Sequence, residues 1–194
     1  MQKSRLALGA IAALTATAIG FAPLTAQSVH ASPALRVATS HAVAALDDPT
    51  IVAIFDAANT WDIDLGNLAL KKSHNADVRT FADMMVRDHS AVRKLGRDLA
   101  HKLNVTPTPP GKDFALYKDY VATLAKLNSL SGAAFDKAYI AHEVWYHQAV
   151  IDAITTTLLP ATKNAELKDL QVKVAPNFQA HLAAAKALET KLGA

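Results

Sequence analysis

Four side chains that can bind a metal ion occupy positions where a helix would normally carry an apolar residue. They come from four widely separated segments of the chain: Asp62, His89, His147 and His181. Imidazole nitrogens and carboxylate oxygens suit iron, zinc, manganese or copper, and iron and zinc are the plainest candidates. The chain has no Cys, so a thiolate ligand is excluded. These residue types predict a transition-metal site, provided that the fold brings the four segments together.

The first of these segments is predicted to be a helix from Asp48 to about His74. Asp48 suits the N-cap and Pro49 suits the first helical position. Asp62 falls in line with an apolar stripe that recurs every three or four residues. A carboxylate at this position would face the core, where it must be paired or must shift its pKa. The apolar members of the stripe are Ile51, Phe55, Ala58, Leu65 and Ala69.

The second predicted helix follows a break at residues 75–77 and runs to about Leu103. Asp88 and His89 flank its apolar stripe on opposite sides, so either side chain could reach the interior. Asp88 could bind a metal ion directly, or it could orient a histidine from outside the site. The stripe consists of Val78, Phe81, Met85, Val92, Leu99 and Leu103.

The third and fourth long helices are predicted over residues 131–159 and 164–192, and each has a histidine in its apolar stripe. His147 interrupts the stripe of the third helix, and His181 interrupts that of the fourth. Glu143 stands four residues before His147, a spacing that lets both side chains reach one point. The apolar members of the two stripes are Ile140, Val144, Ile151, Ile154 and Leu158, followed by Leu167, Leu170, Val174, Phe178, Ala185, Leu188 and Leu192.

Prolines mark the expected breaks between these helices. Residues 104–111 contain three prolines in a short stretch and are predicted to form a loop. A short helix is expected over residues 113–128, either as a crossover or as a lid across one end of the bundle. Pro160 is expected to end the third long helix, and Pro176 to kink the fourth.

The four polar positions should meet at one level of the fold. Each lies within about three residues of the midpoint of its predicted helix, or roughly 5 Å along the helix axis. A residue at mid-helix stays central whether its helix runs up or down, so packing four such helices side by side would bring the four groups into one layer. The sequence therefore predicts an all-α four-helix bundle with an extra short helix. The alternative for the layer is a metal-free hydrogen-bonded network that fixes the packing.

The N-terminus has the features of an export signal. Lys3 and Arg5 precede an uncharged apolar run over residues 6–22, and small residues follow. We expect residues 1–31 to be a signal peptide that is cleaved after Ala31, which would place the protein in the periplasm. The alternative is a retained anchor, but a run of about 17 residues is at the short limit for crossing a bilayer.

The remainder of the chain is expected to form one domain. Residues 32–47 mix Ala, Ser, Thr and Pro with little periodicity and are predicted to be a flexible tether, and residues 48–194 to be the helical domain. No transmembrane segment is expected after cleavage. Without the signal peptide the chain would carry 18 basic and 17 acidic side chains. This near balance is not typical of a protein that binds nucleic acid.

Three segments of the sequence together resemble the domain-of-unknown-function 4142 family. They are IFDAANTWDIDLGNLALKKSHNADVRTFADMMVRDH at 54–89, LSGAAFDKAYIAHEVWYHQAV at 130–150 and VAPNFQAHLAAAKAL at 174–188. The resemblance covers about residues 50–192. It implies a ferritin-like fold and an exported location, with possible association with the outer membrane. It implies no reaction.

The sequence departs from patterns that would indicate a particular reaction. Similar sequences tend to read Glu-x-Glu-Leu-Gly where this chain reads Asp62-Ile63-Asp64-Leu65-Gly66, and the shorter Asp62 side chain reaches less far. The Glu-x-x-His pairs of ferritin-like di-iron proteins are missing. The G-x-S-x-G and H-E-x-x-H motifs are missing as well.

Three functions are compatible with these observations. The leading hypothesis is a binding protein that holds a transition metal for sequestration or stress protection. The second is a metal-free structural or interaction protein. The third is a metal-dependent oxidoreductase that acts on peroxide or oxygen, and the missing Glu-x-x-His pairs count against it.

Overall fold

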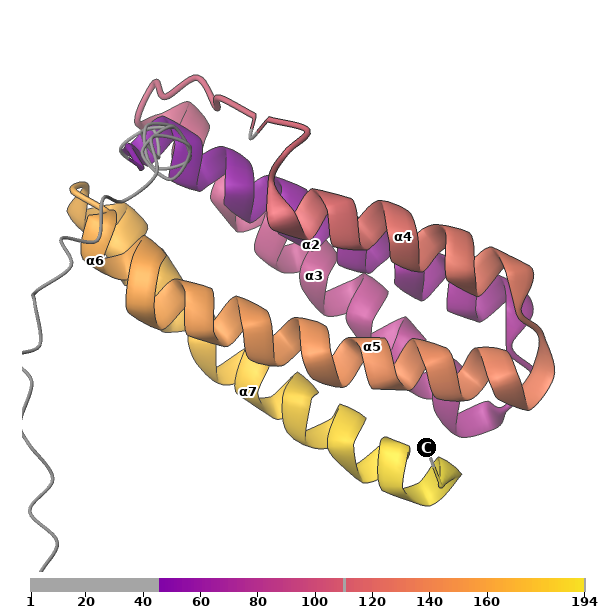
Figure 1. Ribbon diagram of the computed structural model, residues 1–194. Helices are drawn as coiled ribbons and strands as arrows, with labels where there is room; N and C mark the ends of the chain where they lie inside the picture. Colours follow the sequence, from indigo (N-terminus) through magenta and orange to yellow (C-terminus); the bar gives the residue numbers. More distant parts are fainter. Residues whose placement is uncertain (1–45, 110, 194) are drawn as a thin grey trace, which may run out of the picture. The chain divides into compact units, whose positions relative to one another are not determined.

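The computed structural model describes residues 46–109 and 111–193, and this part of the chain is an all-α bundle, as predicted (Figure 1). The expected signal peptide and almost all of the expected tether lie outside the described residues. Among those residues, no helix is both long enough and apolar enough to cross a membrane. The helices are α2 (Asp48–Lys72), α3 (Ala76–Lys102), α4 (Ala115–Ser129), α5 (Gly132–Ala153), the π-helical turn η1 (Ile154–Leu158), α6 (Leu159–Ala161) and α7 (Ala165–Leu192).

The long helices pack in pairs around a common core. Helix α2 packs along α3, α5 packs along α7, and α3 contacts α7 to join the two pairs. The extra helix α4 runs along the outside of the bundle, beside α2 and α5 (Figure 1). It forms where the sequence predicts a short helix between the second and third long helices.

Two apolar clusters fill the interior, one toward each end of the bundle. One cluster contains residues from the start of α2, the end of α3, η1 and the first half of α7, including Phe55, Val92 and Phe178. The other contains residues from the end of α2 and the start of α3 and α5, including Met85 and Tyr139. On each long helix, the predicted polar position lies between the residues of these two clusters. The alternation of apolar and polar residues along each helix therefore produces a buried polar layer between two apolar halves.

The start of α2 differs from the prediction by one residue. Asp47, and not Asp48, is the N-cap, and its Oδ1 accepts a hydrogen bond from the backbone N–H of Thr50 at 2.9 Å. The two carboxylate oxygens of Asp48 instead accept hydrogen bonds from the backbone N–H groups of Lys163 and Asn164, both at 2.9 Å. This contact links the first turn of α2 to the turn that precedes α7.

The expectation that Pro160 ends the third long helix is wrong. The chain widens into the π-helical turn η1 after α5 and continues as α6 through Pro160. Proline is tolerated there because the preceding turn is π-helical, with the N–H of Leu159 bonded to the carbonyl oxygen of Ile154 five residues before it, and the wider turn makes room for the proline ring. The helix ends instead at Thr162, whose backbone is extended. Asn164 then caps α7 by accepting a hydrogen bond from the N–H of Leu167 at 3.0 Å.

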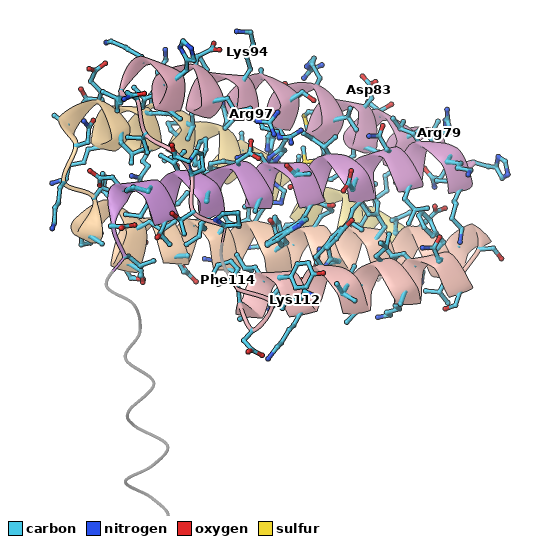
Figure 2. All side chains as sticks on the ribbon, turned by 90° about the horizontal axis from the view of Figure 1, so that it is seen from above. Arg79, Asp83, Lys94, Arg97, Lys112 and Phe114 are labelled. Atoms are coloured by element: carbon cyan, nitrogen blue, oxygen red, sulfur yellow. The ribbon has the colours of Figure 1, made fainter. Side chains whose placement is uncertain are left out.

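Aromatic contacts hold α4 against α2. The ring of Trp61 on α2 stacks on Tyr120 at a centroid distance of 5.7 Å and lies 5.9 Å from the ring of Tyr117. Phe114, at the N-terminal end of α4, lies beside α2 with its ring 6.4 Å from that of Trp61 (Figure 2). Helix α4 therefore covers the side of α2 next to the buried polar layer.

Candidate metal centre

Three imidazole rings from three different helices meet at the middle of the bundle. His89 on α3, His147 on α5 and His181 on α7 have ring centroids 5.2–5.5 Å apart. One nitrogen from each ring lies within 4.8 Å of the corresponding nitrogens of the other two. The three residues are 2%, 1% and 3% exposed. The three nitrogens are therefore close enough to serve together as ligands of one metal ion.

Asp62 on α2 brings a carboxylate to the same place. Its Oδ2 lies 3.1 Å from His89 Nε2 and 3.7 Å from His147 Nε2, and the residue is only 1% exposed. Both Asp62 oxygens are nevertheless without a hydrogen-bond partner among the described residues. Leaving such groups unpaired in the interior is costly, so the arrangement calls for a further partner.

A hydrogen bond to Asn59 orients the ring of His89. Asn59 Nδ2 donates a hydrogen bond to the carbonyl oxygen of Phe55 at 2.7 Å, and its Oδ1 lies 2.9 Å from His89 Nδ1. Because Asn59 Oδ1 can only accept, His89 Nδ1 must carry the proton. The lone pair of His89 Nε2 is then directed at the cluster.

His147 and His181 are fixed in the same manner. His147 Nδ1 lies 3.0 Å from the backbone carbonyl oxygen of Glu143, and His181 Nε2 lies 3.0 Å from Asp88 Oδ2. Each contact makes that nitrogen the donor, which leaves His147 Nε2 and His181 Nδ1 with a lone pair. Both of these nitrogens are buried and have no hydrogen-bond partner in the described part of the chain. Histidine ligands of metal ions are typically oriented by an oxygen acceptor in this way.

The carboxyl group of Glu143 lies at the edge of the cluster. Its Oε2 is 3.4 Å from His147 Nδ1, and oxygen or nitrogen atoms of Asp62, Glu143 and His147 lie within 4.8 Å of one another. Burial raises the pKa of Glu143 to about 8, with the Tyr139 hydroxyl acting in the opposite direction. Glu143 could therefore act as a further ligand or hold a proton beside the centre.

Burial shifts the pKa values of Asp62, Glu143 and His89 toward their uncharged forms. Burial, and next the proximity of Glu143, raises the pKa of Asp62 well above its usual value. Burial, and next the neighbouring His147 and His181, lowers the pKa of His89 well below its usual value. In the metal-free protein, the charged forms of the Asp62 and Glu143 carboxyls and of the His89 ring are therefore disfavoured. A metal ion would stabilise the ionised carboxylate and use the free lone pairs.

The structure places five of the six predicted site residues in two overlapping sets. His89, His147 and His181 form one group of ligand atoms within 4.8 Å of one another, and Asp62, Glu143 and His147 form a second, so His147 belongs to both. Asp88 lies one contact further out, where it accepts a hydrogen bond from His181 and from Arg87 Nε at 2.8 Å.

Sequence reasoning missed Asn59. This residue stands four positions after Phe55 and three before Asp62, a helical spacing that could have placed it on the same face. The predicted apolar stripe instead contains the neighbouring Ala58, because alanine is the apolar residue of the two. The signal in the sequence is the amide of Asn59 three residues before the predicted buried carboxylate of Asp62.

Comparison of the sequence with known families gives a match over residues 32–188 to the family described as Domain of unknown function (DUF4142). The chain belongs to the DUF4142 family. The matched region contains every residue of the candidate centre, so this DUF4142 domain includes both the bundle and the buried cluster. Neither the curated proteins nor the solved structures gave a match.

Proposed function

We propose that this DUF4142 protein binds one transition-metal ion, iron or zinc, between Asp62, His89, His147 and His181. The observation that supports this most strongly is the state of the three rings. Each ring has one nitrogen hydrogen-bonded to an oxygen acceptor, while the other is buried and free to bind a metal ion. Three imidazoles and a carboxylate match the ligand preferences of both metals.

The proposed role is to hold the metal ion, for sequestration or for stress protection. Four protein ligands would complete a tetrahedral site for zinc, and closed sites of this kind are typical of binding and structural roles. We place the protein in the periplasm, with possible association with the outer membrane, because residues 1–31 have the features of an export signal.

An oxidoreductase is the second candidate, and Glu143 is the observation that favours it. A carboxyl group with a pKa raised to about 8 beside the centre could donate or accept a proton near neutral pH. The absence of Glu-x-x-His pairs in the sequence still separates this chain from ferritin-like di-iron proteins. We therefore rank metal binding above catalysis.

The metal-free alternative requires the polar layer to be satisfied by its own hydrogen bonds. The Asn59–His89 and Asp88–His181 contacts would serve such a network. The network is incomplete, however, because His147 Nε2 and His181 Nδ1 lack a hydrogen-bond partner within residues 46–109 and 111–193. A partly satisfied network is worse for stability than an apolar core.

Elemental analysis of the protein purified without an affinity tag tests the proposal. After incubation with iron or zinc and removal of loosely bound metal, we expect about one equivalent to remain per chain. Retention of less than about a tenth of an equivalent of any transition metal would contradict it.

A further inference from the structure

A pocket of about 360 Å³ leads to the buried cluster from one side of the bundle. Its walls come from α2, α3, α5, η1 and α7 and from the start of α4. The principal wall residues are Phe55, Phe114, Val150, Ile154 and Phe178. Of the candidate metal ligands, only His89 and His147 line the pocket. The pocket is thus an apolar chamber that has two imidazoles in its wall.

The polar groups of the pocket are few, and most are already engaged. Among the described residues that line it there is no charged side chain. The hydroxyl of Tyr146 donates a hydrogen bond to the carbonyl oxygen of Ala58 at 2.9 Å. The side-chain amide of Asn59 is already hydrogen-bonded to the carbonyl oxygen of Phe55 and to His89 Nδ1. His89 Nε2 and His147 Nε2 remain without hydrogen-bond partners in the described part of the chain. The hydroxyl-bearing Thr50 and Thr157 also line the pocket, but neither residue is buried, so the imidazoles are the buried groups that a ligand could address.

We infer that this pocket binds an uncharged, apolar molecule whose single neutral polar head, such as a hydroxyl group, lies toward His89 and His147. Apolar walls around a few convergent polar atoms are typical of small-molecule sites, and the volume falls within their usual range. A free imidazole nitrogen accepts a hydrogen bond from a hydroxyl group. A charged head would be buried without a counter-ion, at a large cost in free energy.

The π-helical turn supports a ligand site at this place. Ile154, Thr157 and Leu158, three of the five residues of η1, line the pocket. Turns of this kind are uncommon and occur frequently at functional sites. Here the wider turn forms part of the wall that faces α2 and Phe114.

The proposed metal ion would use the same two nitrogens, His89 Nε2 and His147 Nε2, so the hydroxyl group and the ion compete for them. This binding is therefore tested on the metal-free chain. The metal-free chain would be titrated with 1-octanol and, in parallel, with sodium octanoate by isothermal titration calorimetry. We expect saturable binding of 1-octanol at one site and binding of octanoate weaker by about tenfold or more. Tight binding of octanoate with none of the alcohol would overturn the inference.

Two alanine variants locate the site. Ala153 lines the pocket at the end of α5, and Ala141 is exposed on the same helix. Ala153→Leu should weaken 1-octanol binding by about tenfold, because the added side chain occupies the pocket, whereas Ala141→Leu should not change it. Equal binding by the two variants would contradict the assignment.

A crystallographic readout does not depend on the folding of any variant. Crystals of the unsubstituted protein soaked with 8-bromooctan-1-ol should show the anomalous signal of bromine between α2, α5 and α7. Bromine found only outside this pocket, or an absence of saturable 1-octanol binding, would overturn the inference.

Discussion

His181 Nε2 on α7 donates a hydrogen bond to Asp88 Oδ2 on α3 at 3.0 Å, and this contact sets which nitrogen of His181 is directed at the buried cluster. Arg87 Nε in turn donates to Asp88 Oδ1 at 2.8 Å. The carboxylate is thereby held in place between a surface arginine and a buried histidine. Asp88 therefore acts as a positioning residue in the proposed centre.

Replacing Asp88 with alanine should weaken metal binding while leaving the bundle folded. Loss of the acceptor frees the His181 ring, and the loss of such outer partners lowers metal affinity by about 10- to 100-fold. Asp83→Ala is the matched control, because Asp83 is an exposed acid on the same helix. Competition with a chromophoric chelator measures the affinity. An unchanged metal affinity in Asp88→Ala would show that Asp88 does not position His181 for metal binding.

Replacing His147 with leucine should abolish stabilisation by metal. A ligand present at about 1,000 times its dissociation constant raises the free energy of unfolding by about 4 kcal/mol, and the variant lacks a central ligand. His142→Leu is the control, since His142 lies on the same helix and contacts Thr123 at 3.3 Å, away from the cluster. Thermal unfolding with and without zinc compares the two variants.

The metal-free alternative predicts a different result for His147→Leu. If the polar layer only fixes the packing, His147→Leu should raise the melting temperature, because an apolar residue replaces an incompletely satisfied polar one. Zinc should then stabilise neither the variant nor the unsubstituted protein. That outcome would contradict the metal-binding account.

The stability of the metal-free protein should fall as the pH rises from about 6.5 to 8. The pKa of Glu143 is raised from 4.5 to about 8 in the folded state by burial, so the folded state retains a proton that the unfolded state has lost. The contribution of this retained proton to the free energy of unfolding is fully present below pH 4.5 and is lost as the pH rises through about 8. The raised pKa of Asp62 acts with the same sign. His89, whose pKa is lowered from 6.5, affects stability mainly below that pH.

Glu143→Gln should make this decrease shallower. One proton retained by the folded state corresponds to a slope of about 1.4 kcal/mol per pH unit, and an amide does not titrate. Urea unfolding at pH 6.5, 7.25 and 8 measures the slope. Parallel slopes in the variant and the unsubstituted protein would show that Glu143 is already ionised in the folded metal-free state.

Close packing of α2 on α3 holds Asp62 near His89, and Gly66 is one point of this contact. A Cβ atom added at Gly66 would lie 2.9 Å from Val86 Cγ2 and 3.2 Å from the backbone oxygen of Ala82. Gly66→Ala should therefore destabilise the protein by about 1–3 kcal/mol, despite the higher helix propensity of alanine. Gly111→Ala should be nearly neutral, because a Cβ atom there meets nothing within 4 Å. Chemical unfolding measures both changes, and equal stabilities would contradict the packing described.

Much of the bundle and of its polar layer could be predicted from the sequence. The apolar stripes set the helix faces, and the central position of Asp62, His89, His147 and His181 along their helices predicted one layer. Helix length and periodicity are sufficient for this prediction, because a residue at mid-helix stays central whichever way its helix runs.

Other features depend on contacts between distant segments. Asp47 and Asp48 are both good caps, and the choice follows from the hydrogen bonds of Asp48 to the turn at Lys163 and Asn164. The continuation of the helix through Pro160 rests on the π-helical turn before it, for which the sequence offered no signal. The apolar pocket arises where six helical elements fail to fill the space between them, a result of side-chain packing that periodicity does not describe.

The most direct test of the metal centre is the position of the anomalous signal in crystals grown with zinc or iron. The account predicts one buried ion bound by Asp62, His89, His147 and His181, with zinc–nitrogen distances of about 2.0–2.1 Å. An ion bound only by exposed residues, or a centre without anomalous signal at saturating metal, would contradict it.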